Sequence, residues 1–273
     1  MHDIRLIAMD LDGTLLNSKQ QISEGNRRAL LAARAMGVHL AICSGRCACD
    51  IAGIAMANGL ADCALLSLNG LHCYERFGGE LFADHLFSWE TARQLIDVLW
   101  KSGIVFACFL HNTVVALHDE EKKVWHAHDD NPAKPRMLHR NEPCFDDIEA
   151  PGINKIVCTT PDAELLSSVR AQLEQIDGVE ITSSWFDNLE LIPAGFGKGT
   201  GVAEMAKRLG LNASQVMTFG DNDNDLSMIQ WAGMGIAMEN ATETVKQAAN
   251  FVTLNHDEDG VAYAIRRFVL EEE

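Results

Sequence analysis

The sequence predicts an α/β protein in which a doubly wound parallel sheet is interrupted by an inserted α+β domain. Three observations support this prediction. Apolar runs alternate with helical patterns at both ends of the chain, strands outnumber helices in the middle, and acidic motifs directly follow apolar runs in both outer parts. We therefore assign residues 1–83 and 193–273 to a discontinuous Rossmann-like core, and residues 84–192 to an inserted domain.

The first outer part alternates strand and helix. A helix is expected from Ser23, a good N-cap, to Met36, because Gly37 can end it, and Gly78-Gly79 favours a hairpin. The expected strands are Ile4–Met9, Val38–Cys43 and Ala64–Leu68, with a second helix ending near Asn58. This βαβ order is typical of a parallel sheet.

The middle part has a different pattern. Its expected helices are Ser88–Lys101 and Asp162–Ile176. Its expected strands are Ile104–Phe109, Thr113–Leu117, Asn154–Thr159, Val179–Ser183 and Asn188–Ile192. Residues 119–151 are charged and contain four prolines, so we expect mainly loop or short pieces there. Strands that follow one another without crossover helices predict an antiparallel sheet.

The βαβ order then resumes. Helices are expected at Gly199–Leu209, which Gly210 ends, and at Asp223–Trp231. The expected strands are Val216–Phe219, Met234–Ala237 and Phe251–Thr253. The last part of the chain can therefore complete the sheet that the first part begins.

The composition restricts the possible functions. A chain of 273 residues that is 47% hydrophobic can bury a large core, but its formal charge of −17 makes it a poor binder of nucleic acid or of anionic membranes. Neither a signal peptide nor a membrane span is evident, and the eight cysteines form no C-x-x-C pair. We expect a cytoplasmic protein with reduced thiols, either a monomer or a weak homo-oligomer.

The first acidic motif, Asp10-Leu11-Asp12-Gly13-Thr14, directly follows an apolar strand. Gly13 permits a sharp turn, so Asp10 and Asp12 are expected at the carboxyl end of a central strand, where open α/β sheets place their ligands. Two carboxylates this close repel each other unless a cation or a proton lies between them. The motif therefore predicts a site for Mg²⁺ and covalent chemistry.

The second acidic motif, Gly220-Asp221-Asn222-Asp223-Asn224-Asp225, lies where a strand meets a helix. Asp221 can supply another oxygen ligand, Asn224 can reach a phosphate or a metal-bound water, and Asp225 is expected to support them. An EF-hand does not fit, because Leu226 and Ala232 occupy the positions that need Gly and Glu. Acidic residues at a solvated helix start are the alternative interpretation.

Two further segments can contribute to a phosphate site. Ser44-Gly45-Arg46 closes a strand and opens a helix, so its hydroxyl and backbone N–H groups can bind phosphate, although Ser44 can also serve only as an N-cap. Lys198 precedes another helix and can neutralise phosphate or hold the first aspartate ionised, but alone it could be a surface lysine. The segment around it is not a P-loop, because Gly199 follows the lysine.

Taken together, these motifs resemble the haloacid dehalogenase-like superfamily of phosphohydrolases, in its Cof-type branch with a large α/β cap. The resemblance covers almost the whole chain. It depends on the order and spacing of Asp10–Leu16, Ser44–Arg46, Leu68–Gly70, Lys198-Gly199 and Gly220–Asp225. The chain departs from the usual family pattern at Ser44, where Thr is common, and at Gly197, where a polar residue is common.

The resemblance implies an aspartyl-phosphate mechanism. Asp10 would be the nucleophile and Asp12 the general acid and base. Mg²⁺ would be held by Asp10, by the backbone carbonyl of Asp12 and by Asp221. The phosphoryl oxygens would be bound by Ser44, Lys198, Asn224 and the backbone near Leu11 and Gly45. The sequence does not decide the roles of Arg46, Asn69 and Asp225.

The resemblance further implies that the inserted domain selects the substrate. Trp125, His126, His128 and Trp185 are candidate contacts there, and the two histidines are better explained by a solvated charged loop than by a metal site. We expect a Mg²⁺-dependent phosphatase of small phosphorylated metabolites such as sugar phosphates. A phosphomutase that uses the same aspartyl-phosphate is one alternative, and a phospho-dependent regulatory or binding protein is another.

Overall fold

The computed structural model describes residues 3–272 except for residues 112, 126–135, 141–151 and 184. The chain forms two compact units. The core unit contains Met1–Ala83 and Gly197–Glu273, and the inserted unit contains Asp84–Phe196. The core unit is therefore built from both ends of the chain.

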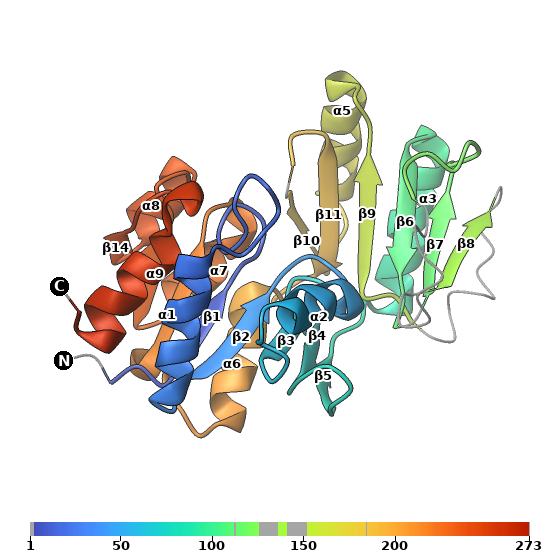
Figure 1. The fold of residues 1–273 in the computed structure, drawn as a ribbon. Helices are drawn as coiled ribbons and strands as arrows, with labels where there is room; N and C mark the ends of the chain where they lie inside the picture. The colour runs from blue at the N-terminus through green and yellow to red at the C-terminus, as the bar shows by residue number, and fades with distance from the viewer. Residues whose placement is uncertain (1–2, 112, 126–135, 141–151, 184, 273) are drawn as a thin grey trace. The chain divides into compact units, whose positions relative to one another are not determined.

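A single mixed sheet runs through the core unit. Among the described residues its strand order is β14-β13-β12-β1-β2-β3-β4-β5 (Figure 1). All pairs from β14 to β3 are parallel, and β3 pairs with β4 antiparallel. The strands are β1 (Leu6–Met9), β2 (His39–Cys43), β3 (Ala64–Ser67), β4 (His72–Tyr74), β5 (Leu81–Asp84), β12 (Val216–Gly220), β13 (Met234–Ala237) and β14 (Phe251–Val252).

Helices cover both faces of this sheet. They are α1 (Glu24–Ala35), α2 (Ala48–Ala57), α6 (Lys198–Arg208), α7 (Leu226–Trp231), α8 (Glu243–Ala248) and α9 (Gly260–Ile265), with 3₁₀ turns at Ala213–Gln215, Asp223–Asp225 and His256–Glu258 and a final π-helical turn at Arg266–Leu270. Strand β1 supplies Ile7 and Met9 to the cluster with α1 and α9, and Leu6 and Ala8 to the cluster with α6 and α7. Burial on both faces explains why β1 is apolar throughout.

The inserted unit contains a second sheet. Its strand order among the described residues is β10-β11-β9-β6-β7-β8. The strands are β6 (Val105–Phe109), β7 (Thr113–Leu117), β8 (Arg136–Arg140), β9 (Lys155–Thr159), β10 (Val179–Thr182) and β11 (Asn188–Pro193). All neighbours are antiparallel except β7 and β8, which are parallel.

Strand β8 is a finding that sequence analysis missed, because it lies within residues 119–151, where mainly loop was expected. Arginines occupy both ends of this short strand. Its two apolar residues, Met137 and Leu138, are therefore too few to form a recognisable strand pattern in the sequence. Pairing with β7, in which Val115 aligns with Leu138, stabilises it as a strand. Much of the remaining segment lies outside the described residues.

In the part of the inserted unit that the structure describes, two helices cover one face of the sheet. These are α3 (Trp89–Ser102), capped by Ser88, and α5 (Ala163–Leu173), capped by Asp162. Phe106 and Cys108 of β6 face the helices and belong to their apolar cluster, whereas Ala107 between them belongs to a smaller cluster on the other face. The alternation is that of a sheet with its helices on one side.

The predicted fold class is confirmed: a mainly parallel, doubly covered sheet is interrupted by an α+β unit. Among the described residues, every helix is either too short or too polar to span a bilayer.

Candidate active site

The two acidic motifs meet at the carboxyl ends of neighbouring strands. Asp10 follows β1 and Asp221 follows β12, which pair in parallel with Met9 opposite Phe219. The backbone N–H of Asp10 continues the ladder by donating to the carbonyl of Phe219 at 3.1 Å. Carboxylate oxygens of Asp10, Asp221 and Asp225 all lie within 4.8 Å of one another. The sheet thus gathers acids that are more than two hundred residues apart in the chain.

Lys198 is the cation of this group. It is the first residue of α6, and its Nζ donates to Asp10 Oδ1 at 2.7 Å and to Asp225 Oδ1 at 2.5 Å. All three side chains are buried. The approach of α6 depends on Gly70, since a Cβ there would lie 2.8 Å from the carbonyl oxygen of Gly197. Lys198 is therefore placed by tight backbone packing.

Asp225 organises the turn after β12. Its Oδ2 accepts hydrogen bonds from the backbone N–H groups of Asp221 at 2.9 Å and Asn222 at 3.0 Å, while Oδ1 accepts from Lys198. A Cβ on Gly220 would lie 2.4 Å from the Cβ of Asp225, so only glycine allows this approach. Because both oxygens of Asp225 already accept hydrogen bonds, Asp225 is better suited to orient Asp221 than to bind a metal directly.

Asp221 is held from the first motif. Its Oδ1 accepts from Thr14 Oγ1 at 2.7 Å, and a Cβ on Gly13 would lie 2.4 Å from its Oδ2. Gly13 also has φ +82°, a conformation that favours glycine. Its carbonyl accepts from Asn240 Nδ2 at 2.8 Å. Neither Thr14 nor Asn240 was predicted to have a role, although Thr14 belongs to the first acidic motif.

Burial and neighbouring negative charges raise the pKa values of Asp10 and Asp221. Burial is the main cause that raises the pKa of Asp10 well above its usual range, and Asp225 and Asp221 add to the increase against the opposing charge of Lys198. Burial and Asp225 likewise raise the pKa of Asp221 to about 6. Burial alone would lower the pKa of Lys198, but Asp10 and Asp225 raise it overall. One ammonium thus faces three carboxylates.

A divalent cation would balance the excess negative charge of this group. Carboxylate oxygens are the donors that Mg²⁺ prefers, and Asp10 and Asp221 offer them within 4.8 Å of each other. A cation between them would offset the repulsion that raises their pKa values. The chemistry of these residues therefore fits a divalent cation such as Mg²⁺, which Asp10 and Asp221 would ligate while Asp225 supports them.

The Ser44 segment lies beside this group, after β2, the other neighbour of β1. Ser44 is buried, and its Oγ accepts from the backbone N–H of Arg46 at 3.3 Å. The expectation that Ser44–Arg46 opens a helix is wrong, because α2 begins at Ala48 with Cys47 as its N-cap. Any phosphate contact here would use loop amides and not a helix N-terminus.

The Leu68-Asn69-Gly70 turn supports that loop. The N–H of Asn69 donates to the Ser44 carbonyl at 2.9 Å, and the N–H of Leu68 donates to the Arg46 carbonyl at 3.0 Å. Leu68 and Asn69 have φ values of +51° and +63°, which are uncommon for residues other than glycine. This turn therefore accepts backbone strain while it holds the Ser44 loop in place.

The remaining predicted residues occupy different surroundings. The Asp12 carboxylate, 47% exposed, is bound by Arg46. Leu11 is buried, Gly45 is half-buried, and Asn224 is half-buried within the 3₁₀ turn that replaces the expected start of a regular helix. The structure thus brings Asp10, Asp221, Asp225 and Lys198 into direct or close contact, and it leaves the phosphate-binding roles as predictions.

The inserted unit holds the other candidates. The backbone N–H of Trp125 donates to Asp119 Oδ2 at 2.9 Å, and the Trp125 ring lies edge-on to Phe109. Trp185 is 65% exposed beside Phe186. His126 and His128 lie outside the described residues.

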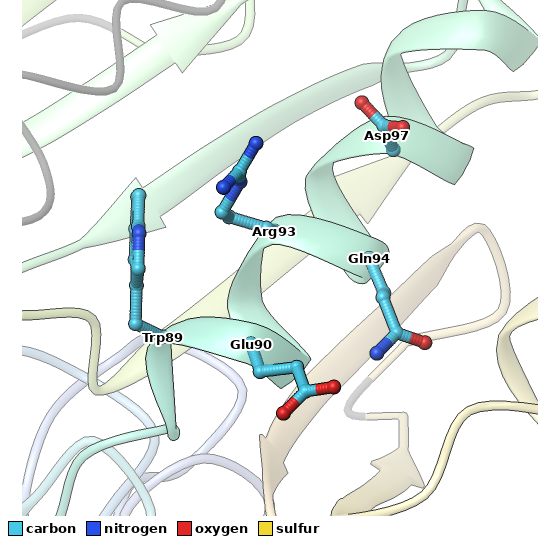
Figure 2. Close-up of a pocket in the computed structure, with 5 residues that line it drawn as sticks. All are labelled: Trp89, Glu90, Arg93, Gln94 and Asp97. Atoms are coloured by element: carbon cyan, nitrogen blue, oxygen red, sulfur yellow. The ribbon is translucent and has the colours of Figure 1, made fainter.

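A hollow of about 450 Å³ lies on the outer side of α3. Figure 2 shows its lining residues along that one helix, with Trp89 and Arg93 rising from it. The lining residues are Trp89, Glu90, Arg93, Gln94 and Asp97. Since none of these is a predicted site residue, the hollow gives no support to the chemistry proposed for the aspartates.

The chain belongs to a hydrolase family. The family model described as "haloacid dehalogenase-like hydrolase" matches residues 7–265, which is most of the chain. This match confirms the family resemblance inferred from the motifs.

Individual relatives indicate which class of hydrolase this is. The "5-amino-6-(5-phospho-D-ribitylamino)uracil phosphatase YwtE" of Bacillus subtilis (strain 168) is 32% identical, over 96% of this chain and 97% of the relative. The "Pyridoxal phosphate phosphatase YbhA" of Escherichia coli (strain K12) is 28% identical, over 96% and 97%. The crystal structure of a haloacid dehalogenase-like hydrolase from Bacteroides thetaiotaomicron has a TM-score of 0.79 and 31% identity, over 97% and 99%. The chain is a phosphoric monoester hydrolase of the Cof-type branch.

Proposed function

We propose that this protein is a Mg²⁺-dependent phosphatase that hydrolyses small phosphorylated metabolites through an aspartyl-phosphate at Asp10. The observation that supports this most directly is the buried Asp10 at the end of β1, with Lys198 Nζ at 2.7 Å and two further carboxylates within 4.8 Å. Phosphoryl transfer needs positioning and charge neutralisation more than proton chemistry, and this arrangement offers both.

In the first half-reaction an Asp10 oxygen attacks the phosphorus and the bond to the leaving alcohol breaks. Asp12 gives its proton to the leaving oxygen. In the second half-reaction the Asp12 carboxylate takes a proton from water, the water oxygen attacks the phosphorus, and Asp10 is released. The sum is ester plus water giving alcohol plus phosphate, with both aspartates restored.

The charged residues around Asp10 support these two half-reactions. Lys198, itself bound by Asp225, holds Asp10 in place and offsets negative charge beside the attacked phosphorus. Ser44, Asn224 and the backbone N–H groups at Leu11 and Gly45 would bind the phosphoryl oxygens. Asp10, Asp221 and the backbone carbonyl of Asp12 would hold Mg²⁺, which supplies charge neutralisation and orientation for the phosphoryl group when bound.

The substrate class is an extension from relatives. YwtE is named for a substrate whose phosphate is on a ribityl chain, and YbhA is named for pyridoxal phosphate. We therefore propose phosphate monoesters of small organic alcohols, including sugar and sugar-alcohol phosphates, as substrates. The inserted unit, residues 84–192 by sequence, would select among them.

The direct test is Asp10→Asn. This change keeps the size and burial of the side chain but removes the nucleophile, so Mg²⁺-dependent phosphate release from an aryl phosphate should fall to background. Circular dichroism and thermal unfolding serve as controls for an intact fold. If the variant kept most of its turnover, Asp10 would not be the nucleophile. In Asp12→Ala, mass spectrometry should detect a phosphorylated enzyme after reaction with the same aryl phosphate.

A further inference from the structure

The side chain of Asp12 is bound at both oxygens by a single residue. Arg46 Nε donates to Asp12 Oδ2 at 2.8 Å, and Arg46 Nη2 donates to Asp12 Oδ1 at 2.5 Å. This two-point contact fixes the plane and direction of a carboxylate, which a single hydrogen bond does not. Arg46, in the loop after β2, thus orients Asp12, in the loop after β1.

Arg46 is itself held from both ends. Its backbone N–H donates to Ser44 Oγ at 3.3 Å, and its carbonyl accepts from the N–H of Leu68 at 3.0 Å. At the far end of the side chain, Nη2 also donates to Gln20 Oε1 at 2.9 Å. The guanidinium therefore has little freedom to leave Asp12 without breaking several contacts.

Gln20 is anchored in turn. It belongs to a tight turn in which its N–H donates to the Asn17 carbonyl at 2.8 Å, and the Asn17 N–H donates to the Gln21 carbonyl at 3.0 Å. Gln20 adopts φ +57°, a left-handed conformation that the turn imposes. The loop after the first acidic motif thus supports the residue that orients Asp12.

From this chain of contacts we infer that Arg46 is a positioning residue for the acid/base group Asp12, and that Gln20 supports Arg46 in that role. The inference rests on the proposed function and deepens it, because it assigns residues to the water-activating half-reaction. Arg46 would not need to touch the phosphoryl group. Its loss would leave Asp10 intact and misdirect Asp12.

An aryl phosphate separates the two half-reactions. A phenolate leaves without an acid, so Asp10 is phosphorylated at full speed even when Asp12 is misplaced. Hydrolysis of the aspartyl-phosphate still needs Asp12 to take a proton from water. Misplacement of a catalytic group by about 1 Å can cost on the order of 100-fold in rate. Arg46→Gln should therefore slow the second half-reaction alone.

The experiment is stopped-flow turnover of p-nitrophenyl phosphate with Mg²⁺, combined with mass spectrometry of quenched enzyme. For Arg46→Gln we expect an undiminished burst of nitrophenolate, a steady-state kcat lower by about 100-fold and accumulated phosphoenzyme. Arg46→Lys, which offers one point of contact, should recover part of kcat, and Gln20→Ala should show a smaller change in the same direction. Arg28→Gln, an exposed arginine paired with Glu24, is the matched control and should be unchanged.

Other outcomes would overturn the inference. If Arg46→Gln slowed the burst as much as the steady state, or raised KM with no phosphoenzyme, Arg46 would act on the phosphoryl group. If Arg46→Gln slowed turnover as strongly in an Asp12→Asn background, Arg46 would not act through Asp12. Failure of the proposed function looks different: no variant, including Asp12→Ala, would form a phosphoenzyme, and Asp10→Asn would stay active. Gln20→Ala and Arg46→Lys keep the test decisive if Arg46→Gln does not fold.

Discussion

The core unit and the inserted unit use buried charge in different ways. In the core unit, Lys198 is shared between Asp10 and Asp225, with Asp221 close by, so acids outnumber the cation. In the inserted unit, Lys155 pairs with Glu190 at 3.3 Å, and its Nζ lies 5.2 Å from the centre of the Phe109 ring. A balanced buried pair is typical of structure, whereas an unbalanced group needs a further positive charge and is typical of a functional site.

The largest expected effect comes from removing each buried lysine. Lys198→Met should lower kcat/KM for an aryl phosphate by about 1,000-fold, because the charge beside the attacked phosphorus is lost. Lys155→Met should change kcat/KM for this generic substrate little, but it should cost about 3–5 kcal/mol of stability, because it removes the buried ammonium that pairs with the buried Glu190. Steady-state kinetics and urea unfolding measure the two effects. An equal loss of activity in both variants would contradict the contrast between the units.

A smaller effect, on the order of 3 kcal/mol, should appear in the free energy of unfolding of the metal-free protein as the pH changes. The pKa of Asp221 in the folded state is about 6, above its ordinary value of 3.8. The folded state therefore binds more protons than the unfolded state between these values, so stability falls as the pH rises from about 4 to about 6. Above that range the Asp221 carboxylate is charged, and the loss of stability due to Asp221 is complete.

The proposed function requires Mg²⁺ to bind the ionised acids, so added Mg²⁺ should reverse this loss of stability. We expect added Mg²⁺ to raise Tm clearly at pH 7.5 and little at pH 4.5. Asp221→Asn is the control, since it should stabilise the metal-free protein at pH 7.5 and abolish the shift. Differential scanning calorimetry measures both. A Tm increase of equal size at both pH values would show that Mg²⁺ acts elsewhere.

The smallest expected effect compares helix caps. Asp162 Oδ1 accepts from the N–H groups of Glu164 and Leu165, each at 3.0 Å, so Asp162→Ala should cost about 1 kcal/mol. Ser23 caps α1 and also donates to Asp259, so Ser23→Ala in the core unit should cost more, about 2 kcal/mol. Chemical denaturation measures both. The opposite order would show that the contact with Asp259 contributes nothing to stability.

Most of the fold was predictable because its pattern is local. The apolar run at β1 and the caps Ser23 and Ser88 are read directly from neighbouring residues, and the structure has them as expected. Strand β8 was not predictable in the same way. Its stability comes from pairing with β7, which no local pattern in a charged, proline-containing segment reveals.

The candidate active site also has a part that could be predicted from the sequence and a part that could not. Strand order places the ends of β1 and β12 side by side, so the meeting of Asp10 and Asp221 follows from topology. The partners of these acids do not. That Lys198 bridges Asp10 and Asp225, or that Arg46 binds Asp12, depends on side-chain conformations and on close backbone approach at Gly70 and Gly220. No local sequence pattern specifies these contacts.

The hydrogen bond from Thr14 to Asp221 joins residues that are 207 positions apart. During synthesis the ribosome adds residues at about 5–20 per second, so the first acidic motif waits roughly ten seconds or more for its partner. Until then β1 lacks the neighbour β12, and an apolar strand edge is open to wrong pairing. A nascent chain that ends before β12 therefore lacks Asp221 and cannot assemble the acidic group at the end of β1.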